Sequence, residues 1–228
     1  MFRTMFAAAA SLMIAASFAY ADEKEDVVNA TKKLSDTSYS WKSTTEGGFG
    51  GAQEGKTQKD GLTWVSLAIR DNTVEIVKQG EKGAVKTQDG WQSIAEASEA
   101  EGAGRFLGTM AQNFRTPAAQ AQDMAEKMKE IKKSDDAYEA TLTEEQAKTL
   151  MTFRRRGGDN QGPQISGAKG TAKFWVKDGA LSKLQYHVEG RRTINNEEQD
   201  VNRTTTVEFK DVGSTKVEVP ADAKAKMK

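Results

Sequence analysis

Residues 171–189 read TAKFWVKDGALSKLQYHVE, and this stretch decides the class of fold. Phe174 and Val176 lie on one side of an alternating segment before Asp178-Gly179, with Trp175 on the other side, and the alternation resumes over residues 184–188. A period of two predicts strands with one buried face, and Asp-Gly is a typical turn between paired strands. The stretch therefore predicts an antiparallel β-hairpin.

Similar patterns occur on both sides of this hairpin. Residues 61–94 read as short alternating segments separated by Asp, Asn and Gly, with a second hairpin dipeptide at Asp89-Gly90. Residues 39–41 begin another strand, and residues 201–210 alternate Val, Arg, Thr and Phe with polar residues. Short strands joined by tight turns predict an antiparallel meander. We expect residues 154–170 to form a polar loop, and Val217 and Val219 to end the sheet.

The middle of the chain has a helical period. Leu107, Met110 and Phe114 recur at helical spacing, and an apolar stripe continues from Ala121 to Ile131, which we expect to end before Asp135-Asp136. Thr116-Pro117 and Thr143–Gln146 are typical helix starts, the second being a capping box. A further short amphipathic helix is expected over residues 24–36. Strands, then helices, then strands predict an α+β domain, with the helices covering one face of the sheet.

The N-terminus predicts export. Arg3 precedes an uncharged run over residues 5–18, and Ala19-Tyr20-Ala21 is a small-x-small cleavage site. This order is typical of a secretory signal peptide, and 14 apolar residues are fewer than the ~20 that cross a bilayer. We therefore predict a signal peptide over 1–21 and a single domain over 22–228, located in the periplasm or secreted.

Composition excludes several classes of function. The chain has no cysteine, which excludes disulfides, thiolate catalysis and acylation of a cysteine after the signal peptide. Lys and Arg together number 33, as do Asp and Glu, so overall charge gives no support for nucleic-acid binding. We expect no transmembrane segment in the mature chain and a monomer.

No motif predicts catalysis or a cofactor. The single histidine, His187, lies on a predicted strand and is read as a polar surface position, since zinc sites need more ligands. No phosphate loop, dinucleotide fingerprint or nucleophile elbow occurs. The run 154–156 of three arginines is compatible with an anion site or with the positive end of the preceding helix. We predict no enzyme, no cofactor and no metal.

The candidate ligand-binding residues form the apolar face of the predicted helices. Methionine side chains suit surfaces that accept variable apolar shapes. Two interpretations stay open: an ordinary core between helices and sheet, or a roof over an apolar cavity. The candidate residues are Leu107, Met110, Phe114, Met124, Met128, Leu150 and Met151.

The order of elements resembles a known superfamily. An N-terminal helix leads to Tyr39-Ser40-Trp41, a meander, a helical block, the segment KFWVKDG at 173–179 with its return strand, and finally Val217–Pro220. This order is similar to the LolA-like and LppX-like periplasmic lipoprotein carriers. The resemblance implies an incomplete antiparallel β-barrel, a curved sheet whose concave face is covered by helices, with acyl chains bound between the two. It implies no catalytic residues.

Two functions are therefore expected from the sequence. The first is a soluble periplasmic binding or carrier protein for a hydrophobic ligand, such as a lipid or the acyl chains of a lipoprotein. The second is a non-enzymatic envelope sensor or assembly module that uses the same fold with a filled core and has an envelope protein as its partner.

Overall fold

The computed structural model describes residues 22–47, 51–69, 72–152, 164–194 and 197–227. The predicted signal peptide, residues 1–21, and the arginine run 154–156 lie outside the described residues.

In the described residues, eleven strands form one sheet in which every neighbouring pair is antiparallel. The order is β6-β5-β4-β3-β2-β1-β11-β10-β9-β8-β7, so β6 and β7 are free edges and the sheet is not a closed barrel. The strands are β1 Tyr39–Glu46, β2 Gln53–Thr57, β3 Thr63–Ile69, β4 Asn72–Gln79, β5 Lys82–Thr87, β6 Gly90–Ser93, β7 Lys132–Ser134, β8 Ala137–Thr141, β9 Gln164–Lys177, β10 Ala180–Ile194 and β11 Glu197–Lys210.

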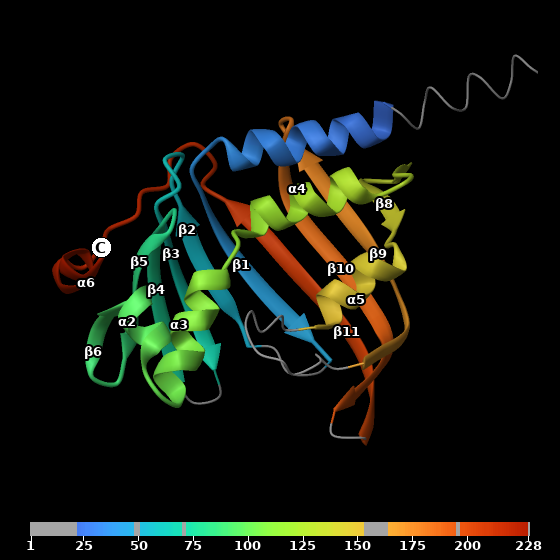
Figure 1. Cartoon of the computed structure of the whole chain (residues 1–228). Helices are drawn as coiled ribbons and strands as arrows, with labels where there is room; N and C mark the ends of the chain where they lie inside the picture. The colour runs from blue at the N-terminus through green and yellow to red at the C-terminus, as the bar shows by residue number, and fades with distance from the viewer. Residues whose placement is uncertain (1–21, 48–50, 70–71, 153–163, 195–196, 228) are drawn as a thin grey trace, which may run out of the picture.

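Six helices accompany the sheet in the described residues. The first covers residues 22–35. The others are α2 Ile94–Glu99, α3 Ala103–Asn113, α4 Pro117–Lys127, α5 Glu144–Met151 and α6 Ala221–Lys226. Figure 1 shows the sheet curving around helix 22–35, α3, α4 and α5, which lie on its concave side.

The inner face of the sheet is the face that these helices cover. Ser43, Val207, Leu184 and Phe174 are successive cross-strand neighbours on β1, β11, β10 and β9, and all four are buried there. Since successive side chains of a strand point to opposite faces, their sequence neighbours form the polar outer face. The main apolar core therefore lies between this inner face and the helices.

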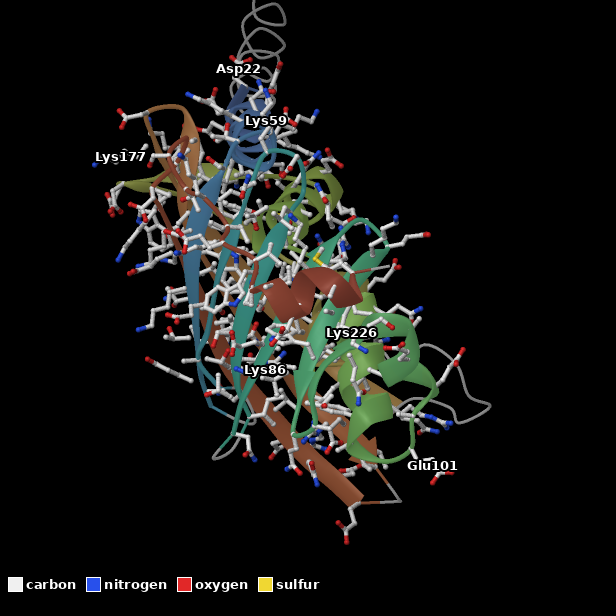
Figure 2. The ribbon with its side chains drawn as sticks, turned by 90° about the vertical axis from the view of Figure 1, so that its left-hand side faces the viewer. Asp22, Lys59, Lys86, Glu101, Lys177 and Lys226 are labelled. Atoms are coloured by element: carbon white, nitrogen blue, oxygen red, sulfur yellow. The ribbon has the colours of Figure 1, made fainter. Side chains whose placement is uncertain are left out.

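Helix α6 lies on the opposite face of the sheet. Val77 of β4 and Ala84 of β5 face outward and form a second, smaller cluster with Ala223 of α6. Figure 2, which views the molecule from the left-hand side of Figure 1, shows α6 lying across the outside of these strands. The chain thus ends on the convex side, away from the main core.

The predicted fold class is confirmed: the protein is α+β, with an incomplete antiparallel barrel and helices on the concave face. The predicted caps are also present. Thr116 Oγ1 accepts a hydrogen bond from the Ala119 amide at 3.3 Å, and Thr143 and Gln146 form the reciprocal capping box of α5. Both caps satisfy amides that a helix start leaves free.

Several predicted elements were wrong. The helix after Pro117 ends at Lys127, because Met128 is extended and the chain turns into β7. Residues 164–170, predicted as part of a loop, begin β9. Val217 and Val219 lie outside the strands.

Candidate ligand-binding site between helices and sheet

The inner face carries a band of small residues beneath α5. Ala168, Gly170 and Ala172 of β9 alternate along this face, and Gly190 of β10 lies beside them. A Cβ atom added to Gly190 would lie 3.0 Å from Cε of Met151, so the methionine rests directly on the glycine. Small side chains let a helix approach a sheet closely. The flexible side chain of Met151 then fills the space between the two.

All seven predicted site residues come together in the main core. Met124, Met128 and Met151 are buried, with at most 6% of the side chain exposed. Leu107 and Met110 of α3, Phe114 after it and Leu150 of α5 are partly buried and pack against the same cluster. The grouping follows from the helical period of the sequence. Contact with a ligand stays a prediction.

An aromatic platform that the sequence analysis did not single out lies in the same region. The ring of Trp41 stacks on Phe114 with their centroids 6.3 Å apart and their planes at 18°. Its other side lies against Gly55 of β2, where an added Cβ would be only 2.6 Å from two indole carbons. Tyr39 meets Phe209 edge to face at 5.7 Å. The only signal in the sequence was Trp41 at an alternating position of a strand.

A cation from another element contacts the C-terminal end of α3, of α4 and of α5. Lys78 of β4 donates to the carbonyls of Ala111, Gln112 and Phe114 at 3.2–3.4 Å, at the end of α3. Burial lowers the pKa of Lys78 below its usual value. The helix dipole favours a cation at a C-terminus, so Lys78 fastens α3 to the sheet.

The other two helices are held in the same way. Lys24 donates to the carbonyls of Glu126 at 3.0 Å and Met128 at 2.6 Å, which fastens the end of α4 to helix 22–35. Arg203 of β11 donates from Nη2 to the carbonyl of Leu150 in the last turn of α5. These three contacts join elements distant in sequence, and no local pattern could have predicted them.

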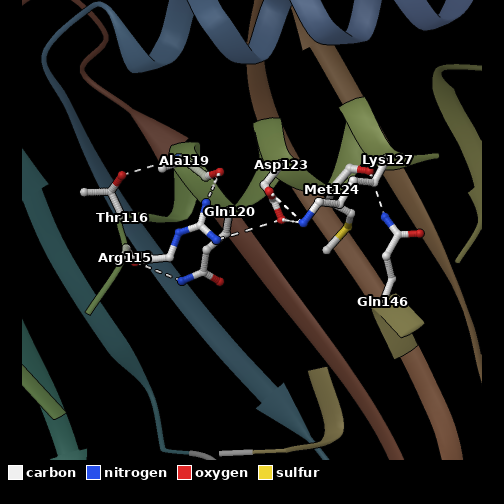
Figure 3. A network of polar contacts seen from close by, with 8 residues as sticks. All are labelled: Arg115, Thr116, Ala119, Gln120, Asp123, Met124, Lys127 and Gln146. Atoms are coloured by element: carbon white, nitrogen blue, oxygen red, sulfur yellow. Dashed lines mark hydrogen bonds and ion pairs between the residues drawn. The ribbon is translucent and has the colours of Figure 1, made fainter. Parts of the chain in front are cut away.

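Polar contacts along α4 add to this attachment (Figure 3). Asp123 forms ion pairs with Lys127 at 3.0 Å and with Arg115 at 3.8 Å on the exposed side of the helix. Gln146 of α5 donates from Nε2 to the carbonyl of Met124 at 3.0 Å. Exposed ion pairs contribute little, so the partly buried hydrogen bond of Gln146 is the polar contact that joins α4 to α5.

The buried polar atoms without a hydrogen-bond partner among the described residues include two nitrogen donors of the inner face, Nε1 of Trp41 and Nε of Arg203. Most buried polar atoms in proteins form hydrogen bonds, and one that does not costs about 1–3 kcal/mol. Close to them, the hydroxyls of Thr45 and Thr205 bond to each other at 3.2 Å. The inner face is therefore apolar with a few polar groups at fixed places.

Burial also changes the ionisation of two tyrosines. It raises the pKa of Tyr39, although contacts with the hydroxyls of Thr116 and Thr57 oppose the change. It also raises the pKa of Tyr138, with a further contribution from its hydrogen bond to Asp26 at 3.1 Å. At neutral pH both phenols are protonated and uncharged, as suits the border of an apolar core.

His187 lies on the outer face of β10, where Nδ1 is 3.1 Å from Oγ1 of Thr204. Within the described ranges no three His, Cys, Asp or Glu side chains gather in a way that could hold a metal ion.

In the part of the chain that the structure describes, no helix has both the length and the apolar character needed to cross a membrane.

Comparisons with known proteins find similar chains among solved structures. No family model and no curated protein matches the sequence. Among solved structures, the chain is similar to the crystal structure of a LolA superfamily protein from Nitrosomonas europaea. The sequences are 8% identical, the match covers 87% of this chain and 94% of that chain, and the TM-score is 0.31. That superfamily is the one whose fold the order of elements resembles.

Proposed function

We propose that this protein binds a hydrophobic ligand, a lipid or the acyl chains of a lipoprotein, between its covering helices and the inner face of the sheet. The proposal rests on one observation above all. Seven apolar side chains from α3, α4, α5 and their ends join one core against the inner face of a curved, open sheet, and Met151 among them rests on Gly190. Methionines over small residues can adjust to a guest of variable shape.

The way in which the helices are held supports a binding role. Helices of 8–11 residues are marginal on their own, so α3, α4 and α5 depend on contacts with the rest of the protein. Their last turns are fastened by Lys78, Lys24 and Arg203, whereas Met151 on the apolar face of α5 rests on Gly190. A methylene moved from water into such a site contributes about 0.8 kcal/mol.

We also place this binding outside the cytoplasm. The predicted signal peptide would be cleaved after Ala21 and leave a chain beginning with helix 22–35. N-terminal sequencing of protein recovered from the periplasm or medium of a secreting host tests this step, and a mature protein that retains residues 1–21 would contradict it.

Ligand binding is tested with the purified mature protein. Native mass spectrometry should detect bound lipid, and a fluorescent fatty acid should bind and be displaced by palmitate. Replacing Leu107, which packs on the core, by Gln should weaken this binding about ten-fold, because a buried leucine contributes about 1.5–3 kcal/mol. Phe106→Gln is the matched control, since Phe106 is 53% exposed on the same helix. Absence of both lipid and probe binding would refute the proposal.

A second function is favoured by a different observation. Met124, Met128 and Met151 are buried as in an ordinary core, which suits a sensor or assembly module with no guest. Ala111→Leu distinguishes the two functions, because Ala111 of α3 is fully buried. In a filled core the larger side chain should cost about 1–3 kcal/mol of unfolding free energy, whereas space under the helices would accommodate it at little cost.

A further inference from the structure

Arg203 occupies an unusual place for a charged side chain. It lies on the inner face of β11, with Val201 and Thr205 two residues away on the same face and Val188 opposite it on β10. The side chain is partly buried, and its Nε atom is fully buried. A guanidinium is always charged in a protein, so the inner face carries a fixed positive charge at this point.

The described residues satisfy this charge only in part. Nη2 donates to the carbonyl of Leu150, Nε has no partner, and no carboxylate of the described residues lies within ion-pair distance of the side chain. A charge that leaves water without a counter-ion is costly unless it is paired. The negative end of the α5 dipole compensates for part of this cost. It does not supply the planar anion that could accept two parallel hydrogen bonds from the guanidinium.

The surroundings of Arg203 change in character along β11. Next to it lie the hydroxyls of the buried Thr205 and the half-buried Thr45, and beyond them the inner face of the strand is apolar through Val207 to Phe209. From Arg203 to Phe209 the strand rises ~20 Å. A charged group, a short hydroxyl-bearing stretch and a long apolar stretch match an amphiphile with an anionic end and an acyl chain.

We infer that Arg203 binds the anionic group of the ligand, a carboxylate or a phosphate, while the acyl chain runs along the inner face toward Phe209. This inference rests on the proposed function and specifies its ligand class. The planar guanidinium fork fits a carboxylate or phosphate, and the Thr45 and Thr205 hydroxyls can donate to its remaining oxygens. The bound anion supplies the missing counter-charge and accepts from Nε.

The experiment compares ligands that share one acyl chain. Palmitate, palmitoyl lysophosphatidate and the neutral hexadecanol are titrated into the mature protein and followed by calorimetry. The wild type should bind the better of the two anions about 10- to 100-fold more tightly than hexadecanol, as expected for charge-assisted hydrogen bonds. Which anion binds more tightly identifies carboxylate or phosphate as the group recognised.

Variants at Arg203 separate recognition from a structural role. R203Q should remove most of the preference for the anion and leave hexadecanol affinity unchanged within about three-fold. R203K, which keeps the charge without the fork, should keep part of the preference. The control is R191Q, because the Arg191 side chain is 63% exposed and pairs with Glu198 and Asp200.

Each outcome decides one question. If the wild type binds hexadecanol as tightly as both anions, or if R203Q keeps the preference, the inference about Arg203 is overturned and the binding function stands. If R203Q weakens all three ligands equally, Arg203 only fastens α5, which also overturns it. If no ligand binds the wild type, the proposed function itself fails, and the inference with it.

Discussion

The contact between Gly55 and Trp41 gives the sharpest test of the packing at the site. An alanine at position 55 would place its Cβ 2.6 Å from the Trp41 atoms Cε2 and Cζ2 and 2.7 Å from the carbonyl oxygen of Trp64. Real Cβ atoms do not approach so closely, so the indole has to move. Trp41 is stacked on Phe114, and the displacement therefore reaches the junction of α3 and α4.

The expected cost follows from two opposing terms. Overpacking costs about 1–3 kcal/mol, and replacing a glycine in a strand by alanine returns about 0.5–1 kcal/mol through the unfolded chain. Gly55→Ala should therefore lower the unfolding free energy by about 1–2 kcal/mol. For a chain of this size that corresponds to a fall in melting temperature of about 2–8 °C.

The assay is urea unfolding of Gly55→Ala, Trp41→Phe and the double variant, followed by circular dichroism. Phenylalanine lacks the indole atoms that meet the new Cβ, so the double variant should lose less stability than the sum of the single changes, with a coupling of about 1 kcal/mol. A Gly55→Ala protein as stable as the wild type, or a double variant with additive losses, would show that Trp41 does not lie against this strand as described.

Three further changes test the attachment and ionisation of the core. Lys78→Met should cost about 1 kcal/mol and speed amide exchange in α3, whereas Lys86→Met, which breaks a largely exposed ion pair with Glu75, should stay within about 0.5 kcal/mol; equal effects would contradict the helix-end contact. Thr143→Ala should lower the unfolding free energy by about 1 kcal/mol, measured by thermal melting. An unchanged stability would mean that the capping box does not stabilise α5. Because burial raises the pKa of Tyr39, the unfolded chain loses this proton first, at about pH 10.0, and stability should fall as pH rises above that value. From pH 9 to 11 the urea midpoint of Tyr39→Phe should fall less steeply with pH than that of the wild type. An equal slope in the two proteins would show that Tyr39 does not cause the loss of stability.

The sequence predicted the elements whose buried positions carry large apolar side chains. The hairpin at Asp178-Gly179 and the meander from β3 to β6 have this property, whereas the starts of α4 and α5 were predicted from their capping residues. Strand β2, with the sequence QEGKT, was missed because its inward positions hold Gly55 and Thr57. The apolar side chain that covers this part of the sheet belongs to the neighbouring strand β1, because Trp41 fills the space above Gly55.

The start of β9 was missed for the same reason. Its inward residues Ala168 and Gly170 are small because α5 lies close above them, and Met151 and Leu142 fill the space instead. The spacing of apolar residues is read within one segment of the sequence. Here a strand with small inward residues is buried by side chains from other segments. The apolar residues Met128 and Ile131 led to the prediction of a longer helix. Both are buried, but they lie in the chain that follows the end of α4 at Lys127.

The same division explains which site residues the sequence could provide. A helix face shows itself by its period, so the seven apolar candidates were found together. Lys78 and Arg203 matter only through carbonyl groups that lie 33 and 53 residues away in the chain, and in the sequence they look like any other charged residue of a strand. The apolar lining of the inner face is thus encoded locally, whereas the polar groups that hold the helices, and that would select a ligand, are encoded by the topology. If Arg203 selects the ligand as proposed, a change of specificity would need only a few inward strand positions such as 203, while the helix face proposed to bury the acyl chain could stay the same.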